Sequence, residues 1–496
     1  MPVVALKTFG CKVNRCDTAA MALGLRERGF EAVPAPRENA DAFLVNTCAV
    51  TARAVQKTAK HLRGLRRDHP RAPIAVYGCA VSYAGAFADV ENAAFFERGA
   101  EAQALDFLQE RLLEDPESQI PKQPCRRQSG RTLTAENGED AEGHGRGFPR
   151  NTPRFPRLDP SPIAAGSPGG SPSNAPGSSV FQDSGSPSPL SSSRTPGQDP
   201  LTLGRTRAFV KVADGCDGRC TFCVVPRLRG PFRSRPLEEI LEETRALAGA
   251  GHREIVPVAV HLGCWGEDLD PPRKPGELVE KIASVPGVER VRLSSLESAK
   301  LGEDLLDLAG HEGVAPHFHL PLQSGDASVL ERMGRGYTPE AFLDAVDRIR
   351  KRFPTVAVTT DVIAGFPGES EDAFGNTLAL CRKAAFSRIH AFPFSVRPGT
   401  PAASYPDLLS KREIRARMDA LLSLGRALAE RFRAGRIGAT DRVLLERPVK
   451  DRPGFFEGLD GVYQRVIVPA LDEEAGRLVD VRITGVEGNR CVGERV

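Results

Sequence analysis

Three closely spaced cysteines offer the most specific chemistry in this 496-residue sequence. Cys216, Cys220 and Cys223 follow the spacing C-x3-C-x2-C, in a loop that also contains two glycines. Cysteine thiolates bind zinc or iron–sulfur clusters, and glycines allow a backbone to turn tightly around a compact group. Three thiolates leave one ligand position open, which is typical of a metal group that takes part in a reaction. A structural zinc with a distant fourth ligand is the alternative interpretation.

A second set of three cysteines lies near the start of the chain. Cys11, Cys48 and Cys79 each follow an apolar run that predicts a strand, over 3–8, 42–46 and 74–77. Helical patterns alternate with these runs, over 14–28, 52–67 and 102–113, so residues 1–115 are expected to form a small doubly wound α/β domain. Because parallel strands end at one edge of such a sheet, the three thiols can converge on one site. Three unrelated buried cysteines are the alternative.

Residues 116–205 differ in composition from the rest of the chain. They are rich in serine, proline and glycine and show no apolar period, and they contain one further cysteine, Cys125, to which we assign no role. A segment of this kind buries too little apolar surface to offset the entropy lost on ordering. The composition therefore predicts a disordered linker.

The part of the chain that carries the C-x3-C-x2-C loop, residues 206–435, repeats a strand pattern followed by a helix pattern. The expected strands are 208–213, 254–261, 290–294, 317–322, 356–363 and 389–394. The expected helices are 237–248, 276–283, 301–309, 339–350 and 372–382, followed by a long one over 410–435. Six such units indicate a partial (β/α)6 barrel, with the cysteine loop after its first strand and polar loops lining a site at the strand ends.

Short strand patterns separated by glycines occupy the last segment, residues 436–496. They cover 442–446, 463–468, 478–484 and 491–495, which predicts a small β-barrel, a shape often used to bind nucleic acid. The net charge of the whole chain is only +3, so charge alone does not argue for a nucleic-acid partner.

The overall composition is that of an ordinary globular protein, with 40% hydrophobic and 26% charged residues. The first residues lack a basic region followed by an apolar stretch, so no secretion signal is expected. No apolar run is long enough to cross a membrane. We therefore expect a cytoplasmic setting without membrane contact, in which the 11 cysteines are reduced and available to metal.

With both cysteine sets in view, the sequence resembles the radical S-adenosylmethionine (SAM) methylthiotransferases. The C-x3-C-x2-C loop, with Phe222 before its last cysteine, is similar to the radical-SAM signature. The resemblance covers the chain except residues 116–205. It implies an N-terminal methylthiotransferase domain over 1–115, a radical-SAM core over 206–435 and an RNA-binding domain of the TRAM type over 436–496.

The resemblance also implies the cofactors, namely SAM and two [4Fe–4S] clusters. One cluster would be held by Cys11, Cys48 and Cys79, and the other, which binds SAM at its open iron, by Cys216, Cys220 and Cys223. In the implied reaction, one SAM methylates sulfide carried by the first cluster. Cleavage of a second SAM then gives a radical that enables C–S bond formation at C2 of an adenine. The candidate SAM contacts are Phe222, Ser295 and Gln323.

Four motifs are similar to the branch of the family that modifies threonylcarbamoyladenosine in tRNA. They are Gly10-Cys11-Lys-Val-Asn14, His261-Leu-Gly-x-x-Gly-Glu-Asp-Leu269, Leu322-Gln-Ser-Gly-Asp326 and Thr360-Asp-Val-Ile-Ala-Gly-Phe-Pro-Gly-Glu369. This branch implies the tRNA anticodon loop as partner, together with an electron donor and a sulfur donor of unknown identity. The alternatives are isopentenyladenosine in tRNA, an aspartate of a ribosomal protein, and a non-catalytic RNA-binding protein stapled by metal.

Overall fold

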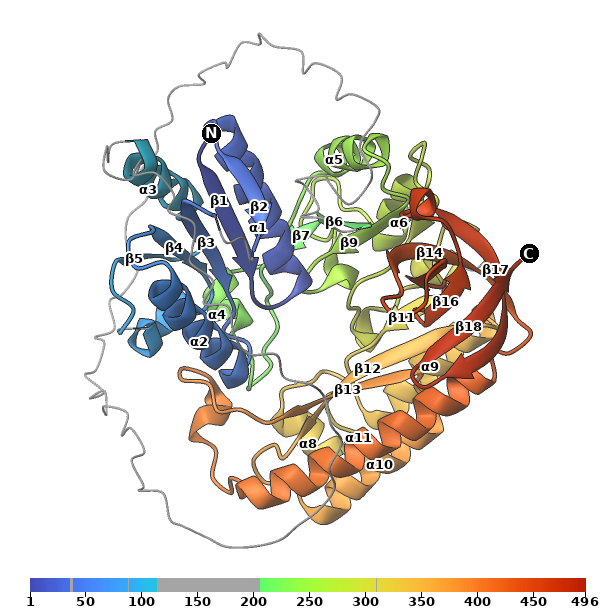
Figure 1. Ribbon diagram of the computed structural model, residues 1–496. Coiled ribbons are helices and arrows are strands. Elements are labelled where there is room, and N and C mark those ends of the chain that lie inside the picture. Colours follow the sequence, from blue (N-terminus) through green and yellow to red (C-terminus); the bar gives the residue numbers. More distant parts are fainter. Residues whose placement is uncertain (36–38, 88, 114–205, 309) are drawn as a thin grey trace, which may run out of the picture. The chain divides into compact units, whose positions relative to one another are not determined.

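The computed structural model describes residues 1–35, 39–87, 89–113, 206–308 and 310–496 (Figure 1). The linker predicted over 116–205, with Cys125, lies outside these described residues.

The N-terminal part is a five-stranded parallel sheet in the order β2-β1-β3-β4-β5. The strands are β1 Val3–Thr8, β2 Glu31–Pro34, β3 Ala42–Thr47, β4 Ile74–Gly78 and β5 Ala93–Phe96. Helices α1 (Lys12–Glu27) and α3 (Glu101–Leu113) pack on one face, whereas α2 (Ala52–Asp68) and the 3-10 segment Val81–Phe87 pack on the other. The doubly wound α/β prediction is confirmed. The edge strands β2 and β5 were not predicted, because four residues are too few to show a period.

The strand order reverses between β1 and β3, since the chain leaves β1 for β2 on one side and later returns to β3 on the other. Open parallel sheets bind ligands in the crevice beyond the carboxyl ends of the strands at such a reversal. Cys11 follows β1 and Cys48 follows β3, so two of the predicted ligands flank this crevice.

The core contains six parallel strands in two three-stranded sheets, β10-β9-β6 and β11-β12-β13. Isolated parallel bridges, Val291 to Val314 and Ser295 to His319, join the two sheets between β10 and β11. The strands are β6 Arg207–Lys211, β9 Glu254–Val258, β10 Arg290–Val291, β11 His317–His319, β12 Ala357–Ala364 and β13 Arg388–Pro393. The predicted partial (β/α)6 barrel is therefore confirmed.

The longer helices of the core follow the predicted pattern with local start signals, whereas two short ones, α4 (Val225–Arg229) and α8 (Ala327–Arg332), were not predicted. Thr338 begins α9 by accepting a hydrogen bond from the backbone N–H of Ala341, and Ser410 forms a capping box with Glu413 at the start of α11. One helix, α7, is a single turn, shorter than the predicted 301–309. The helices are α4 Val225–Arg229, α5 Leu237–Gly249, α6 Pro275–Ala283, α7 Glu303–Leu306, α8 Ala327–Arg332, α9 Pro339–Arg352, α10 Glu371–Ala384 and α11 Lys411–Ala434.

The C-terminal segment is a closed barrel in the order β14-β15-β16-β18-β17, as predicted. Its strands are β14 Thr440–Pro448, β15 Phe455–Leu459, β16 Arg465–Pro469, β17 Leu478–Glu487 and β18 Arg490–Arg495, and β15 was not predicted. Within the described part of the chain, no helix has the length and apolarity that crossing a bilayer requires.

Candidate active site

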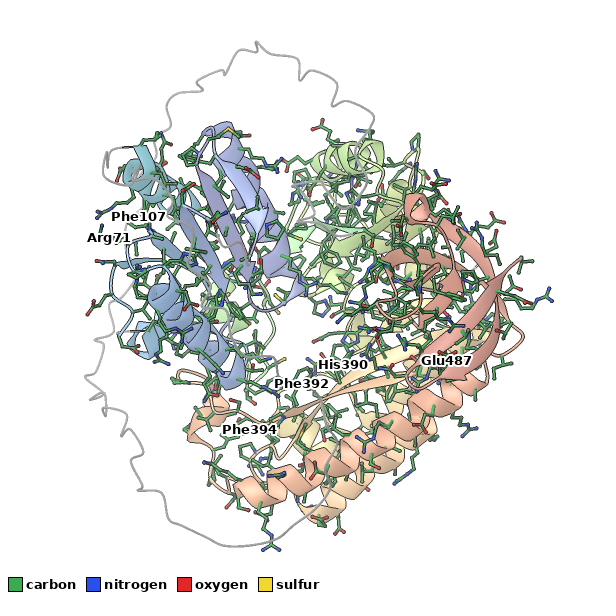
Figure 2. The ribbon with its side chains drawn as sticks, viewed as in Figure 1. Arg71, Phe107, His390, Phe392, Phe394 and Glu487 are labelled. Atoms are coloured by element: carbon green, nitrogen blue, oxygen red, sulfur yellow. The ribbon has the colours of Figure 1, made fainter. Side chains whose placement is uncertain are left out.

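A single cavity of about 640 Å³ brings together every residue that the sequence singled out for chemistry. Its wall contains both cysteine sets and the three candidate SAM contacts: Cys11, Cys48, Cys79, Cys216, Cys220, Cys223, Phe222, Ser295 and Gln323. Residues from β13 complete one side, and Figure 2 labels two of them, His390 and Phe392. The N-terminal sheet and the core thus contribute to the same cavity.

Two glycines allow the N-terminal cysteines to approach one another. Gly10 has φ +110°, and a Cβ atom built there would lie 2.9 Å from the Cys48 Sγ atom. Gly78 has φ +106°, and a Cβ there would lie 2.6 Å from the side-chain oxygen of Asn46. Only glycine combines this backbone with this spacing. The Gly-Cys pairs therefore fix the positions of Cys11 and Cys79 after their strands.

Asn14, which is fully buried in the first turn of α1, ties together the strand ends that carry Cys11 and Cys48. Its Nδ2 group donates to the carbonyl oxygens of Phe9 at 3.1 Å and Thr47 at 2.7 Å. Its Oδ1 atom accepts a hydrogen bond from the Cys11 thiol at 3.3 Å. One side chain therefore sets the spacing between two of the three thiols.

The loop with the second cysteine set is held in place by the core. Gly215 has φ +75°, and a Cβ there would lie 1.8 Å from the carbonyl oxygen of Pro231. Thr221 donates its backbone N–H to the carbonyl of Met333 at 2.9 Å and its hydroxyl to the carbonyl of Arg332 at 2.8 Å. The loop is thus fastened to the C-terminal end of α8.

Each sulfur of this loop accepts a hydrogen bond. The backbone N–H groups of Gly218 and Val225 point at the Cys216 and Cys223 sulfurs, at 3.3 and 3.4 Å. The guanidinium of Arg335 lies 3.3 Å from the Cys220 sulfur. Donors of this kind favour the thiolate form, whereas burial of the thiol raises the pKa of Cys223 to about 11. A positively charged metal group would resolve this conflict, because metal binding releases the thiol protons.

Arg229, on the helix that follows the cysteine loop, connects the two cysteine regions. Its guanidinium donates to Asn14 Oδ1 at 2.6 Å and Asp17 Oδ2 at 3.2 Å in the N-terminal domain, and to Asp214 Oδ1 at 2.7 Å in the core. Only 3% of its side chain is exposed. Arg98 also pairs with both carboxylates, at 2.9 and 2.7 Å.

Asp214 immediately precedes the cysteine loop, and its charge is held by this network. Burial alone would raise the pKa of its carboxyl, but Arg229, Arg98 and Lys211 together lower that pKa well below its usual value. The carboxylate is therefore ionised and fixed between cations from both domains, which locks the start of the loop to α1.

The candidate SAM contacts all face the cavity, and their role as SAM contacts stays a prediction. The Phe222 ring packs edge-on against Phe366, with ring centroids 6.4 Å apart. Gln323 has φ +66°, a left-handed conformation that is uncommon for a residue other than glycine. Its backbone N–H donates to the carbonyl of Asp361, and its own carbonyl accepts from Ile363, which maintains that conformation against β12.

A charged chain runs from the cysteine loop along the strand ends. Its connections are not visible in the sequence, although the polar strand-end loops were expected to line the site. Arg335 donates to Glu297 Oε1 at 2.6 Å, and His261 Nε2 lies 3.2 Å from Glu297 Oε2. Burial lowers the pKa of His261, but hydrogen bonds to Cys264 and Glu297 outweigh it and raise that pKa to about 9. His261 is therefore cationic near neutral pH, and Arg335 is fixed beside Cys220.

The part of the cavity wall formed by the last three core strands is polar. His319 Nε2 lies 3.4 Å from Asp361 Oδ2, and ligand atoms of His319, Asp361 and His390 lie within 4.8 Å of one another. Arg388 and Thr359 belong to the same wall. These residues alternate along their strands, so their side chains lie on one face. These wall residues could have been predicted from the sequence, because polar residues recur at every second position of otherwise apolar strands.

The C-terminal barrel also reaches the cavity, through Tyr463 in the loop between β15 and β16. Its ring stacks on His317 with centroids 4.7 Å apart, and Arg292 lies over it at 4.9 Å. Arg292 also donates to the backbone carbonyls of Asp460 and Gly461, at 2.8 and 2.7 Å. No local pattern in the sequence marks this tyrosine, since its place depends on how the barrel packs on the core.

The anchor of this packing is a buried ion cluster. Glu254 is fully buried and accepts from Arg290 at 2.7 Å and Arg292 at 2.8 Å. Burial alone would raise the pKa of Glu254, but the two arginines lower it to about 2. Arg290 continues to the carbonyl oxygens of Arg442 and Leu459 in the C-terminal barrel, at 2.7 and 2.9 Å.

Comparison with known proteins agrees with this architecture. Residues 210–381 match the radical SAM superfamily, and residues 3–94 match a family described as Uncharacterized protein family UPF0004. In solved structures, the chain is similar to a radical SAM methyltransferase, TsrM from Kitasatospora setae. The TM-score is 0.50 and the identity 16%, covering 81% of this chain and 75% of that one. The barrel thus has the fold of a radical-SAM protein.

Two relatives match nearly the whole chain. The threonylcarbamoyladenosine tRNA methylthiotransferase MtaB of Bacillus subtilis is 30% identical over 486 residues, which cover 97% of this chain and 94% of the relative. The tRNA-2-methylthio-N(6)-dimethylallyladenosine synthase of Syntrophotalea carbinolica is 31% identical over 496 residues, covering 99% of each. The chain belongs to the radical-SAM methylthiotransferase family. The resemblance seen in the sequence is thereby confirmed.

Proposed function

We propose that this protein is a tRNA methylthiotransferase, which places a methylthio group on C2 of N6-threonylcarbamoyladenosine beside the anticodon. The observation that carries the proposal is the single cavity whose wall contains both cysteine sets and a polar, cationic side. The two relatives named above act, by their names, on adenosines with different N6 groups, and their identities to this chain are nearly equal. The choice between these substrates therefore rests on the chemistry of the cavity wall.

The donor sets fit the two [4Fe–4S] clusters and the SAM that this family implies. Each set offers three thiols to one cavity, and the sulfurs of Cys216, Cys220 and Cys223 already receive hydrogen-bond donors, which suit cluster-bound thiolates. Cys11, Cys48 and Cys79 would hold the second cluster. When bound, these groups supply the radical chemistry and the methylthio sulfur.

The chain's own residues would bind, orient and enclose the reacting groups. Phe222, Ser295 and Gln323 would contact SAM. Arg335 would stabilise the negative charge on the Cys220 sulfur, and Arg229 would keep the two cysteine sets in register. A base in the anticodon loop is single-stranded, so it can be turned out of the loop and inserted into the cavity at modest cost.

The polar wall favours the threonylcarbamoyl group over an isopentenyl group. Its side chains include His319, Asp361, Arg388 and His390, and Lys12 lies in the same cavity. An isopentenyl group in this position would desolvate these charges without offering them a partner. The threonylcarbamoyl group carries a carboxylate, a hydroxyl and a urea, which can satisfy them.

Each domain has a separate role in the proposed reaction. Residues 1–115 supply the sulfur, residues 206–435 generate the radical, and residues 436–496 act as a TRAM-like domain that binds tRNA. Residues 116–205 connect the first two. The sulfur donor and the electron donor are further partners of unknown identity, and tRNA as substrate places the reaction in the cytoplasm.

The decisive experiment is mass spectrometry of tRNA nucleosides from a deletion strain. We expect loss of the 2-methylthio derivative of threonylcarbamoyladenosine and its return when the wild-type chain is supplied. Loss of the isopentenyl derivative instead would assign the other tRNA substrate. An unchanged set of nucleosides would contradict a tRNA substrate and point to a protein such as a ribosomal protein.

Iron and SAM cleavage test the cofactors. Anaerobic reconstitution is expected to give about eight irons per chain, from two four-iron clusters, and dithionite-dependent 5′-deoxyadenosine. The Cys220→Ala variant should hold about four irons and form no 5′-deoxyadenosine. Cys381→Ala is the matched control, because Cys381 is buried in α10 away from the cavity. Zinc in place of iron, without SAM cleavage, would support the non-catalytic alternative instead.

A further inference from the structure

Resting on the proposed function, we propose that Lys12, Arg388 and His390 bind the carboxylate of the N6 side chain of the target adenosine. This contact would select an adenosine with an anionic N6 group over one with an apolar group. The three residues come from the start of α1 and from β13, and all of them line the cavity that contains both cysteine sets.

Lys12 is a cation without a carboxylate partner. Its side chain is half-buried in the cavity wall, and it makes no hydrogen bond or ion pair with any residue that the structure describes. The nearby cations are already paired, since Arg207 donates to Glu446 at 2.9 Å and Arg292 to Glu254 at 2.8 Å. A desolvated ammonium is costly unless it meets an anion. A ligand carboxylate would supply that anion.

Arg388 is an exposed cation on the neighbouring wall, so solvent reaches it, but it too lacks a carboxylate partner among the described residues. Its guanidinium makes no hydrogen bond or ion pair within the described part of the chain. Lys12, Arg388, His319 and Asp361 all lie close enough to His390 for their charges to act on it. Two basic side chains, Lys12 and Arg388, therefore act on His390 together with a single carboxylate, Asp361.

The rest of the wall fits the neutral groups of the same side chain. Thr359 Oγ1 lies 2.9 Å from His319 Nδ1 and 3.1 Å from His317 Nε2, and Asp361 lies beside His319. Hydroxyl, imidazole and carboxylate groups can bind the hydroxyl and the urea of a threonylcarbamoyl group. An alkyl group would offer no partner for their remaining hydrogen-bonding capacity, and sites built for polar groups reject apolar analogues strongly for that reason.

The position of Lys12 is compatible with a base whose C2 atom faces the cysteines. Lys12 follows Cys11 directly, yet its electrostatic neighbours are Tyr463, Arg207, Arg292 and Glu254 on the core and C-terminal barrel. C2 and N6 leave the adenine ring in divergent directions. A base with C2 toward the cysteines can thus direct its N6 group toward the polar wall.

The first test neutralises the ligand and leaves the protein unchanged. The reconstituted holoenzyme is given anticodon stem-loops that carry threonylcarbamoyladenosine, its methyl ester or isopentenyladenosine. We expect KM for the ester to rise on the order of 10- to 100-fold, the loss typical of a hydrogen bond to a charged group. Equal KM values for acid and ester would overturn the inference. Failure of the wild-type enzyme to modify the acid form at all would instead contradict the proposed function.

The second test removes the cations. Lys12→Met and Arg388→Gln should each bring the ester-to-acid KM ratio down toward one, whereas Lys281→Met, on an exposed position of α6, should keep the wild-type ratio. Because Lys12 adjoins Cys11, its variant must first be shown to hold its iron. If the Lys12 variant loses iron, the Arg388 variant alone decides the test, because Arg388 is remote from the cysteines in sequence.

Unchanged ratios in both variants would overturn the inference. So would a stoichiometric divalent metal that is lost in His390→Gln, because the wall would then hold a cation rather than an anion.

Discussion

Replacing Arg229 by methionine tests whether the two cysteine regions work as one site. The Arg229 side chain is only 3% exposed. Its guanidinium donates to Asn14, Asp17 and Asp214 at 2.6, 3.2 and 2.7 Å. Breaking a buried ion pair by removing one partner costs about 3–5 kcal/mol. Arg98 still pairs with both carboxylates in the variant, so we expect the lower end, about 3 kcal/mol.

The variant should lose more product formation than its lower stability alone would explain. Without Arg229, the region of the Cys216 loop loses its hydrogen bonds to Asn14 and Asp17 of α1, and of the described residues only Arg98 and Lys211 still link Asp214 to Asp17. A small displacement between reacting groups can lower a rate by about 100-fold. We therefore expect 5′-deoxyadenosine still to form, while the methylthiolated nucleoside formed per 5′-deoxyadenosine falls at least about 10-fold.

The assay measures both products in the same anaerobic reaction, together with thermal unfolding of the reconstituted protein. Arg235→Met is the matched control, since Arg235 pairs with Glu243 at 2.7 Å within the core and is 29% exposed. Arg229→Lys keeps the charge but not the forked donors. Its product ratio and melting temperature should therefore fall between those of Arg229→Met and Arg235→Met. If Arg229→Met matched both the product ratio and the melting temperature of Arg235→Met, the reasoning would be refuted.

Further results are expected for three other variants and for the pH dependence of stability. Gly215→Ala should hold about four irons instead of eight, because the added Cβ meets the Pro231 carbonyl at 1.8 Å; iron near eight would contradict this. Cys79→Ala should retain dithionite-dependent 5′-deoxyadenosine but form no methylthiolated nucleoside, and product formation would exclude Cys79 as a ligand. Glu254→Gln should cost about 3–5 kcal/mol and free the C-terminal barrel for proteolysis, which electrophoresis would show. Since the pKa of Glu254 is lowered from 4.5 to about 2, its contribution is complete above pH 4.5 and is lost as the pH falls toward 2; unfolding curves without that acid dependence would disagree.

The strands and the cysteines that follow them were predictable because both are local patterns. An apolar run followed by Gly-Cys or Thr-Cys needs no distant information, and the strand-then-helix repeat of the core fixes its topology through short right-handed connections. The edge strands β2 and β5 escaped prediction, because each has only four residues and packs on one neighbour.

Both cysteine sets, and with them the family and its chemistry, were determined by the sequence alone. Only the tertiary structure decided what surrounds them. Nothing in the sequence shows that Arg229, Lys12 and Tyr463 belong to one site, although Arg229 lies near the cysteine loop and Lys12 lies in the motif that contains Cys11. They become parts of one cavity because α1 packs on β6 and β9, and because Glu254 with its two arginines fastens the C-terminal barrel to the core. Such contacts depend on how distant segments pack, and no local period or spacing encodes them.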